Sequence, residues 1–203
     1  MRYKIEKNTV QETLIIPLYA RKMCSELYPN LYRDEAARRL VNAVDYDFSA
    51  LEKKSRNLMQ RFGFLEVAMR QNDLAYEVRD YLKTHPTAAV VNLGCGLDCT
   101  GRACDNGHCK IYNLDFPDVI AVRNQLLPAG ERETNISCDL NDTAWFEKID
   151  AWDSSLRVSS RGYMLGYHNL KDPSVGGLFR FLARVGDGMM NMQIIKIGFG
   201  GKR

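Results

Sequence analysis

Two glycines and two aspartates near the middle of the chain have the types and spacing that suit the binding of a nucleotide or nucleoside. Gly94 and Gly96 flank Cys95 in a short turn. Glycine lets the backbone bend sharply and approach a ligand closely, because it has no Cβ. Asp115 follows Gly94 by 21 residues, close to the separation of about 20 at which an acid accepts hydrogen bonds from ribose hydroxyls. Asp139 stands in a third polar turn further on.

Short apolar segments precede each of these polar positions. Residues 88–93, 109–114 and 134–138 are too short for helices, and their composition predicts buried parallel strands. Ligands of open α/β sheets bind at the edge where the carboxyl ends of the strands meet, so the pattern predicts a site there. The alternative is that the two aspartates are N-caps of helices at 116–127 and 143–149.

The sequence N-L-G-C-G-L-D-C-T at residues 92–100 resembles the first motif of the leucine carboxyl methyltransferase family, which also contains many bacterial O-methyltransferases of the polyketide-synthesis type. That family has the form N-L-G-x-G-x-D-T. Asp98 matches its aspartate, whereas Cys99 stands where threonine is usual. Further matching segments lie at residues 15–22, 68–73, 112–117 and 137–142, so that the resemblance covers most of residues 10–150.

The resemblance implies a class I methyltransferase fold, which is a Rossmann-like α/β sheet with an N-terminal helical lid. It also implies S-adenosylmethionine, or its product S-adenosylhomocysteine, as the cofactor. The turn of Gly94, Cys95 and Gly96 would lie against the methionine and ribose, and Asp115 would accept from the ribose hydroxyls. Phe116 would pack on the adenosine, although a core phenylalanine fits the sequence equally well.

The same resemblance assigns roles to four other residues. Asp139 would accept from the adenine amino group, with Leu140 beside the ring. Arg70 falls where family members hold the cofactor's carboxylate, with Lys22 as a second cation. A guanidinium suits that role because it offers a planar fork of donors to a carboxylate. The alternative for Arg70 is a solvated helix arginine or a structural ion pair.

The expected reaction is methyl transfer to an oxygen of a small-molecule acceptor, either a hydroxyl or a carboxylate. Positioning alone can contribute about 7–11 kcal/mol, and only a hydroxyl acceptor calls for a base. Tyr163, Tyr167 and His168 are candidates for that base, but each also suits a structural role, and no catalytic residue is assigned.

Composition favours a globular protein of one domain, with 203 residues, 45% of them hydrophobic and 26% charged. A net charge of +3 without a basic run argues against nucleic acid as a partner. With no apolar leader and no stretch that could span a membrane, we expect a cytoplasmic protein without a membrane partner. A homodimer stays open.

Four of the six cysteines, Cys95, Cys99, Cys104 and Cys109, are spaced C-x3-C-x4-C-x4-C. This spacing lacks the C-x2-C knuckle of structural zinc sites, so we expect free thiols and no metal. Reduced thiols also agree with a cytoplasmic location.

The order of elements predicts one methyltransferase domain in three parts. Residues 1–85 form a helical cap, residues 86–150 form the cofactor-binding units, and residues 155–203 form the C-terminal strands and a helix. Within the cap we expect helices over 9–28, from a cap at Asp34 to about 43, over 49–61, over 62–70 and over 74–83. Near the C-terminus we expect a helix over 177–185 and a last strand over 192–199. The fourth and fifth strand units of the fold are missing, which indicates an internal deletion near residues 150–154. Such a sheet would leave one flank of its central strand exposed.

Two further hypotheses compete with an active methyltransferase. A nicotinamide-dependent oxidoreductase shares the strand, the turn and the acid, but its G-x-G-x-x-G motif would need glycine at Cys99. An inactive or truncated methyltransferase remnant, acting as a cofactor-binding or partner module, is the hypothesis that the apparent deletion supports.

Overall fold

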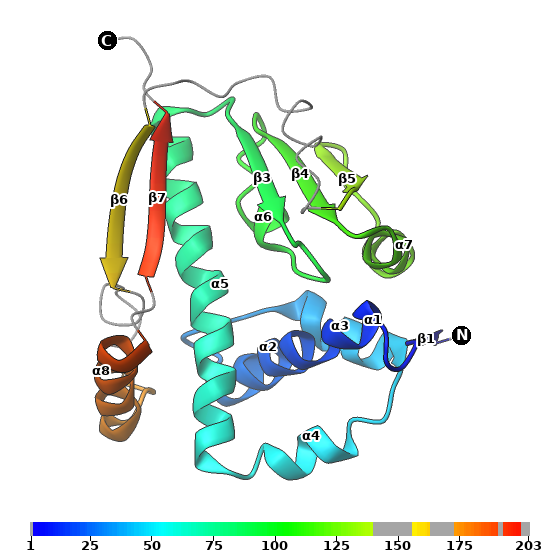
Figure 1. Cartoon of the computed structure of the whole chain (residues 1–203), viewed down its shortest axis with the longest axis vertical. Coiled ribbons are helices and arrows are strands. Elements are labelled where there is room, and N and C mark those ends of the chain that lie inside the picture. Colours follow the sequence, from blue (N-terminus) through cyan, green and yellow to red (C-terminus); the bar gives the residue numbers. More distant parts are fainter. Residues whose placement is uncertain (1, 140–155, 163–172, 191–192, 200–203) are drawn as a thin grey trace. The chain divides into compact units, whose positions relative to one another are not determined.

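The computed structural model describes residues 2–139, 156–162, 173–190 and 193–199 (Figure 1). The chain divides into two compact units, Met1–Asp142 and Thr143–Arg203. The boundary between the units lies shortly before residues 150–154, where the sequence indicates a deletion. The predicted junction itself falls outside the described ranges, and the single-domain organisation stays a prediction.

A parallel sheet of three strands forms the framework of the first unit. The strands β3 (Ala89–Leu93), β4 (Lys110–Asp115) and β5 (Glu133–Ser137) lie in the order β3-β4-β5. Their bounds confirm the three predicted strands to within a residue. Among the strands that the structure describes, β3 pairs only with β4, so no fourth strand is seen on its other edge.

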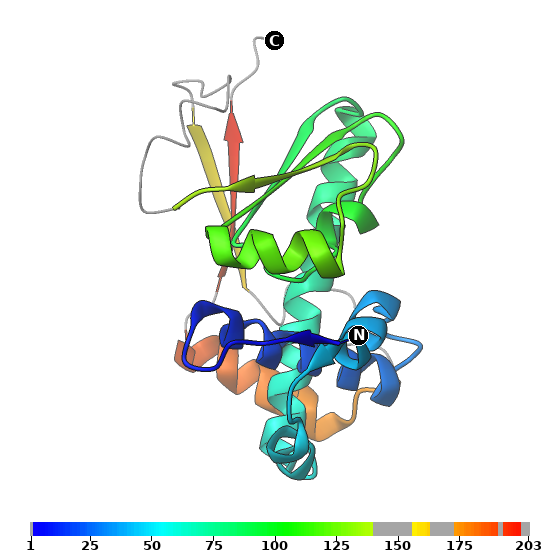
Figure 2. The ribbon, with the colours of Figure 1, turned by 90° about the vertical axis from the view of Figure 1, so that its right-hand side faces the viewer.

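Three helices connect to the strands of this sheet. The 27-residue helix α5 (Leu58–Thr84) leads into β3, the short helix α6 (Thr100–Ala103) follows it, and α7 (Pro117–Leu126) follows β4. Figure 2 shows α5 (teal) and α7 (green) beside the strands. Ile111 and Asn113 point to the same face of β4, since side chains alternate along a strand. Ile111 packs with α5, and Asn113 is bonded to Asn135, which accepts from Arg123 of α7, so both helices cover this face. Apolar residues of α5 pack with Ile111 of β4 and with two cysteine thiols beside α6; this cluster contains Ala75, Leu82, Cys104, Cys109 and Ile111.

The N-terminal helices lie at the carboxyl ends of the strands (Figure 1). They are α1 (Val10–Thr13), α2 (Ile15–Leu27), α3 (Glu35–Ala43) and α4 (Ser49–Lys54), with a small parallel pair of β1 (Tyr3–Lys4) and β2 (Val44–Asp45). Their buried side chains join residues that follow β3 and β4 in one cluster: Ile5, Leu14, Ile15, Leu18, Ala37, Leu40, Val44, Leu97, Val119 and Val122. The cap and the end of the sheet therefore share a core.

The helix boundaries differ from the sequence prediction in two places. The predicted helix over 9–28 is divided at Leu14, because Pro17 has no N–H to bond the carbonyl of Thr13. The stretch 49–61, expected as one helix, is interrupted after α4, where Asn57 accepts from the amide of Met59 and caps α5. The two helical stretches predicted between residues 62 and 83 are one continuous helix, α5.

The described part of the second unit contains an antiparallel pair and a helix. The strands β6 (Leu156–Gly162) and β7 (Gln193–Phe199) pair with Leu156 opposite Phe199, and α8 (Gly177–Met190) lies between them in sequence. The expected last strand is thus confirmed, and it is the second strand of this antiparallel pair. The helix predicted at 177–185 extends to Met190.

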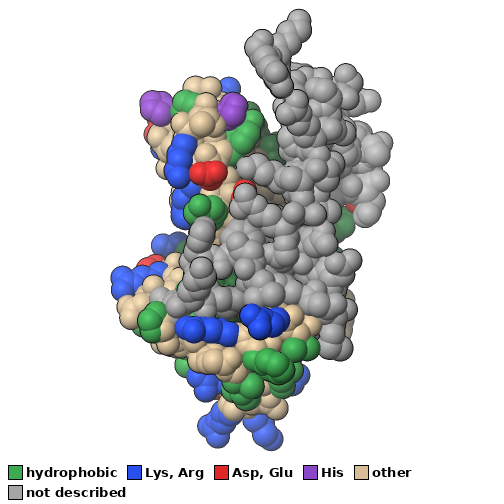
Figure 3. All heavy atoms as spheres, turned by 90° about the vertical axis from the view of Figure 1, so that its left-hand side faces the viewer, with side chains coloured by type: hydrophobic (Ala, Val, Ile, Leu, Met, Phe, Trp, Pro, Cys, Tyr) green, Lys and Arg blue, Asp and Glu red, His purple; other side chains and the backbone are tan. Residues whose placement is uncertain are grey.

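The described residues were also compared for surface charge and for helices that could cross a membrane. Basic side chains are prominent on the described part of the face in Figure 3, and acidic ones are few. Among the described residues, no helix is both long and apolar enough to cross a membrane.

Candidate cofactor site

The glycine turn after β3 has the backbone geometry for which glycine is needed. Gly94 and Gly96 have φ angles of +64° and +49°, in the left-handed region that side-chain-bearing residues rarely adopt. A Cβ on Gly96 would also lie only 3.2 Å from Cδ2 of Leu14. Between them, the amide of Cys95 donates to the carbonyl of Leu114 at 3.1 Å, which fixes the turn to the end of β4.

Asp115 at the end of β4 faces this turn. Its carboxylate accepts from the amide of Gly96 at 2.8 Å through Oδ2 and from the amide of Phe116 at 2.8 Å through Oδ1. The residue is 7% exposed. The N-cap of α7 is Phe116, without a side-chain capping bond, so the structure does not support the alternative in which Asp115 is the helix cap.

Six of the nine predicted site residues line one cavity of about 370 Å³ in the first unit; they are Arg70, Gly94, Cys95, Gly96, Asp115 and Phe116. The cavity lies where the glycine turn, α5 and the N-terminal helices meet. Apolar side chains supply much of the remaining wall, namely Val10, Leu14, Pro17, Val67, Leu74, Leu97 and Val119. The cavity thus combines an apolar wall with a few polar groups, which is typical of small-molecule sites.

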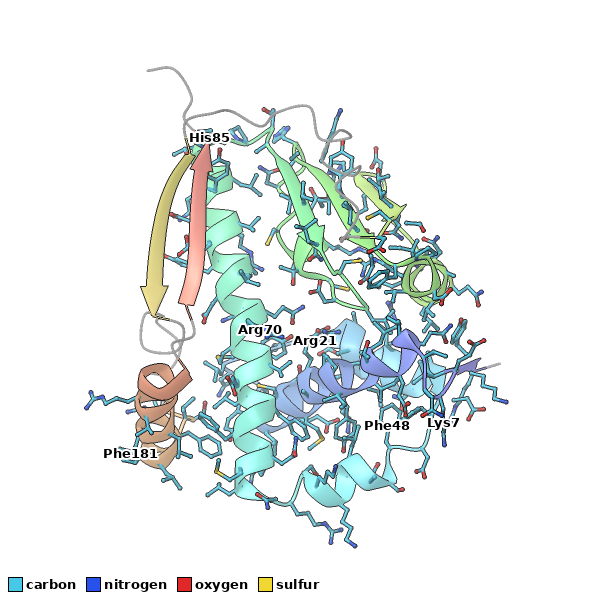
Figure 4. The ribbon with its side chains drawn as sticks, viewed as in Figure 1. Lys7, Arg21, Phe48, Arg70, His85 and Phe181 are labelled. Atoms are coloured by element: carbon cyan, nitrogen blue, oxygen red, sulfur yellow. The ribbon has the colours of Figure 1, made fainter. Side chains whose placement is uncertain are left out.

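Two guanidinium groups line this cavity, from Arg70 on α5 and Arg21 on α2 (Figure 4). The Arg70 side chain is exposed, whereas Arg21 is buried. Arg21 forms an ion pair with Asp34 at 3.0 Å and donates to the carbonyl of Leu97 at 2.8 Å. The cavity therefore has a cation held rigidly against the turn and a second cation that is accessible.

Lys22 does not line the cavity, and the second cation there is its neighbour Arg21. The Lys22 ammonium pairs with Glu26 at 2.9 Å and lies 5.6 Å from the ring centroid of Tyr19. The helical repeat explains the difference, because Arg21 shares the buried face of α2 with Leu14 and Leu18 at the i, i+4, i+7 spacing. That spacing is the signal that would have selected Arg21 from the sequence.

Asp139, which was predicted to contact the adenine, does not line the described cavity. The amide of Cys138 donates to the carbonyl of Asp115 at 2.9 Å, so Asp139 follows at the same edge of the sheet, where its side chain is exposed. Leu140 lies outside the described residues, as do Tyr163, Tyr167 and His168.

A buried arginine on α7 holds the glycine turn through hydrogen bonds, and the sequence analysis did not predict this arginine. Arg123 on α7 is 1% exposed and donates to the carbonyls of Gly96 at 2.9 Å and Asp98 at 2.8 Å. Its Nε donates to Oδ1 of Asn135 at 3.2 Å. These bonds hold the turn's carbonyls toward α7. Position 123 is far from the motif in sequence, and a lone arginine in a helix carries no signal of this role.

Three asparagines in register cross the sheet beneath the same turn. Asn92 on β3 lies opposite Asn113 on β4, which in turn lies opposite Asn135 on β5. Asn113 Nδ2 donates to Asn135 Oδ1 at 3.1 Å, and Asn92 Nδ2 donates to Asp98 Oδ1 at 3.0 Å. Asp98, the aspartate of the first motif, also accepts from the amide of Thr100 at 3.0 Å through the same oxygen, so it holds the chain after the turn while it lines the cavity.

Near the turn, the thiol of Cys95 is buried and that of Cys99 is partly buried. Burial raises the pKa of Cys95 to about 12, and burial also raises the pKa of Cys99, so both thiols are protonated at neutral pH. None of the six cysteines, each within the described ranges, forms a disulfide. In that part of the chain, no group of three or more His, Cys, Asp or Glu side chains is placed to hold a metal ion.

A parallel sheet with a glycine turn after one strand and a buried acid after the next defines an α/β protein of the nucleoside-binding class. The sequence profile of the leucine carboxyl methyltransferase family matches residues 15–156. The chain belongs to this family of S-adenosylmethionine-dependent methyltransferases. The predicted family is therefore confirmed.

The chain is also similar to the tetracenomycin polyketide synthesis O-methyltransferase TcmP of Streptomyces glaucescens, with 28% identity over 141 residues. The aligned part is 69% of this chain and 50% of that protein. The chain thus spans about half the length of this relative.

Proposed function

We propose that the chain binds S-adenosylmethionine in the cavity beside the glycine turn and transfers its methyl group to an oxygen of a small molecule. The observation that carries the proposal is the composition of this one cavity. It brings together the turn of Gly94 and Gly96, the carboxylate of Asp115 and the guanidiniums of Arg70 and Arg21. The cofactor needs acceptors for its ribose hydroxyls and donors for its carboxylate, and the lining offers both.

The roles of individual residues follow from their chemistry. Each carboxylate oxygen has two lone pairs, so Asp115 can accept from ribose hydroxyls while it keeps the bond from the amide of Gly96. Arg70 is exposed to the cavity and offers its fork of donors to the cofactor's carboxylate, while Arg21 adds positive charge from its fixed position. Phe116 lies in the lining beside Asp115, where a ring can pack on adenosine. Asp139 and Leu140 remain the proposed adenine contacts.

The bound cofactor supplies a methyl group already activated by its sulfonium. The protein then has to hold the acceptor oxygen in line with that methyl group and keep water out. The apolar wall of Leu14, Val67 and Leu74 suits both tasks. A carboxylate acceptor loses no proton, whereas a hydroxyl acceptor must lose one, and for that step we propose no particular base.

The proposed acceptor is a small molecule with a hydroxyl or carboxylate and an apolar body. The apolar part of the lining supports this, as does similarity to a protein named as a polyketide synthesis O-methyltransferase.

The alternative is a chain that binds the cofactor and does not turn over. It is favoured by the single described partner of β3, which agrees with the internal deletion that the sequence indicates. An oxidoreductase is disfavoured because Cys99 occupies the third glycine position of the nicotinamide motif.

Calorimetric titration of the purified chain with S-adenosylhomocysteine tests the proposal, with NAD as the comparison ligand. We expect saturable binding of the first ligand alone. Arg70→Ala and Asp115→Asn should each weaken it by about tenfold or more, since each removes a charged hydrogen-bonding group. Lys22→Ala is the matched control, because Lys22 is a cation on the same helix as Arg21 but lies outside the cavity. The affinity of this variant for S-adenosylhomocysteine should stay within about twofold of that of the parent chain.

Absence of binding by the folded chain, or an equal loss in Lys22→Ala and Arg70→Ala, would contradict the assigned site. If the cofactor product binds as expected, a methylation assay with small phenols and carboxylic acids separates the enzyme from the non-catalytic module. Transfer of methyl groups supports the enzyme.

A further inference from the structure

A second and larger cavity, of about 440 Å³, lies beside the cofactor cavity in the first unit. The loop before α3, the start of α3, one face of α5 and the residues of α6 form its walls. We call it the arginine groove, and its lining is Leu31, Tyr32, Arg33, Asp34, Glu35, Ala36, Arg39, Gln71, Asn72, Ala75, Arg79, Cys99, Thr100, Arg102 and Ala103. Nothing in the proposed methyl transfer uses it.

The groove has an excess of positive charge from Arg33, Arg39 and Arg79. The hydrogen bonds of Arg33 and Arg79 go to the backbone carbonyls of Pro29 and Ala103, which leave the charge of each guanidinium uncompensated. Arg39 has no acidic partner among the residues that the structure describes.

The other charges of the groove are already paired. Asp34 pairs with Arg21 at 3.0 Å, Glu35 pairs with Arg38 at 3.2 Å, and Arg102 pairs with Glu133. Within each of these three pairs the positive and the negative charge offset each other. The lining therefore presents three guanidiniums, from three different parts of the unit, around one concave space.

A partition of polar groups separates the groove from the cofactor cavity. Arg21 lines the cofactor cavity and its partner Asp34 lines the groove, while Gln71 lines both. Tyr32 donates to Asp34 Oδ2 at 3.2 Å and is hydrogen bonded to Gln71. Tyr32 and Asp34 are buried, so the partition is a fixed wall and the two cavities are distinct sites.

We propose that the arginine groove binds a compact multivalent anion, either a phosphate ester or a polycarboxylate. Guanidiniums bind phosphate and carboxylate oxygens through two parallel hydrogen bonds, and three of them around one space match an anion that carries several such oxygens. Thr100 and Asn72 add neutral hydrogen-bonding groups to the same lining. The proposal depends on the charges of this groove and not on methyl transfer.

Titration of the full chain with pyrophosphate and with citrate tests the proposal. We expect saturable binding of at least one anion that weakens as ionic strength rises, because the Debye length at 0.1 M salt is only about 10 Å. Arg39→Ala and Arg79→Ala should each weaken it by about fivefold or more. Preference for pyrophosphate would assign the groove to phosphate esters, and preference for citrate to carboxylates.

Lys54→Ala is the matched control. Lys54 lies on α4, is exposed and does not line the groove, so its removal lowers the net charge without changing the groove. Its loss should leave anion affinity within about twofold. Glu35→Gln removes the exposed acid of the lining and should strengthen binding.

Two results would overturn the proposal. One is the absence of saturable binding of either anion by the folded chain. The other is an equal loss of affinity in Lys54→Ala and Arg39→Ala, which would mean attraction to net charge alone. Failure here is distinguishable from failure of the methyltransferase proposal, since Arg39→Ala should retain S-adenosylhomocysteine binding and Arg70→Ala should retain anion binding.

Discussion

Arg123 illustrates how a single buried charge can organise a ligand turn without touching the ligand. Its guanidinium donates to two carbonyls of the turn region, those of Gly96 and Asp98. A buried cation is costly unless its donors are satisfied, and carbonyl oxygens satisfy them here. The bond to the carbonyl of Gly96 fixes the peptide group after this residue, while the peptide group before it donates its N–H to Asp115.

Replacing Arg123 with leucine should destabilise the chain by about 2–4 kcal/mol, because two part-buried carbonyls lose their donors. Urea denaturation measures the change. Arg132→Leu is the control, since Arg132 is partly exposed and pairs with Asp105, and its loss should cost clearly less. Equal effects of the two substitutions would show that the turn does not depend on Arg123.

Asp73 on α5 gives a prediction for the pH dependence of stability. Burial, followed by the nearby charge of Glu77, raises the pKa of this carboxyl from 3.8 to about 8. The folded state therefore retains a proton that the unfolded chain releases above pH 3.8. The contribution of Asp73 to stability is complete below that pH and is lost as the pH rises through about 8.

Asp73→Asn removes this titration. The difference between the melting temperature of the variant and that of the parent chain should therefore shift in favour of the variant as the pH is raised from 5 to 8. Thermal melts at several pH values measure the difference. A difference that stays constant over this range would contradict the raised pKa.

At the scale of elements, two helical glycines make opposite predictions. A Cβ on Gly101 of α6 would lie 2.6 Å from Cγ2 of Ile111 on β4, whereas a Cβ on Gly63 of α5 would have no atom within 4 Å. Gly101→Ala should therefore destabilise by about 1–3 kcal/mol through overpacking. Gly63→Ala should stabilise by about 0.5–1 kcal/mol, because alanine loses less backbone freedom in a helix. Chemical denaturation of both variants compares them directly, and destabilisation by Gly63→Ala would show that this helix position is crowded.

The elements were predictable where one local signal dominates. The apolar runs of β3, β4 and β5 and the turn glycines carry such signals, as does Asp34, which caps α3 by accepting from the amide of Ala37. The break at Leu14 was missed because the apolar pattern continues past Pro17. The start of α5 was missed because the apolar pattern also continues past its cap, Asn57.

The candidate site was predictable in part for the same reason. Six residues were found from a turn, a strand end and a motif, all of which are local in sequence. Arg21 was not separated from Lys22, because the choice depends on which face of α2 meets the turn. Arg123 and the arginine groove depend on contacts between distant segments, which no local pattern encodes.

At the scale of the whole molecule, the sheet of the first unit makes a prediction about hydrogen exchange. β4 is paired along both edges, whereas β3 has one partner among the described strands. Amides of β4 should therefore exchange more slowly than those of β3. Hydrogen–deuterium exchange with peptide mapping measures both. Equal protection of β3 would show that its other edge is covered, and would argue against an open flank.

The asparagines that cross the sheet have a further consequence, for how the strands find their alignment during folding. A shift of β4 by one residue would turn the side chain of Asn113 to the other face, and a shift by two would place it opposite Val90. Either shift would separate its buried amide from Asn135, at a cost of about 1–3 kcal/mol. The paired amides therefore favour the native register of β4 over the shifted ones. Of the sheets that these apolar strands could build, the one that gives Asn113 its partner is also the one that sets Asp115 beside the glycine turn.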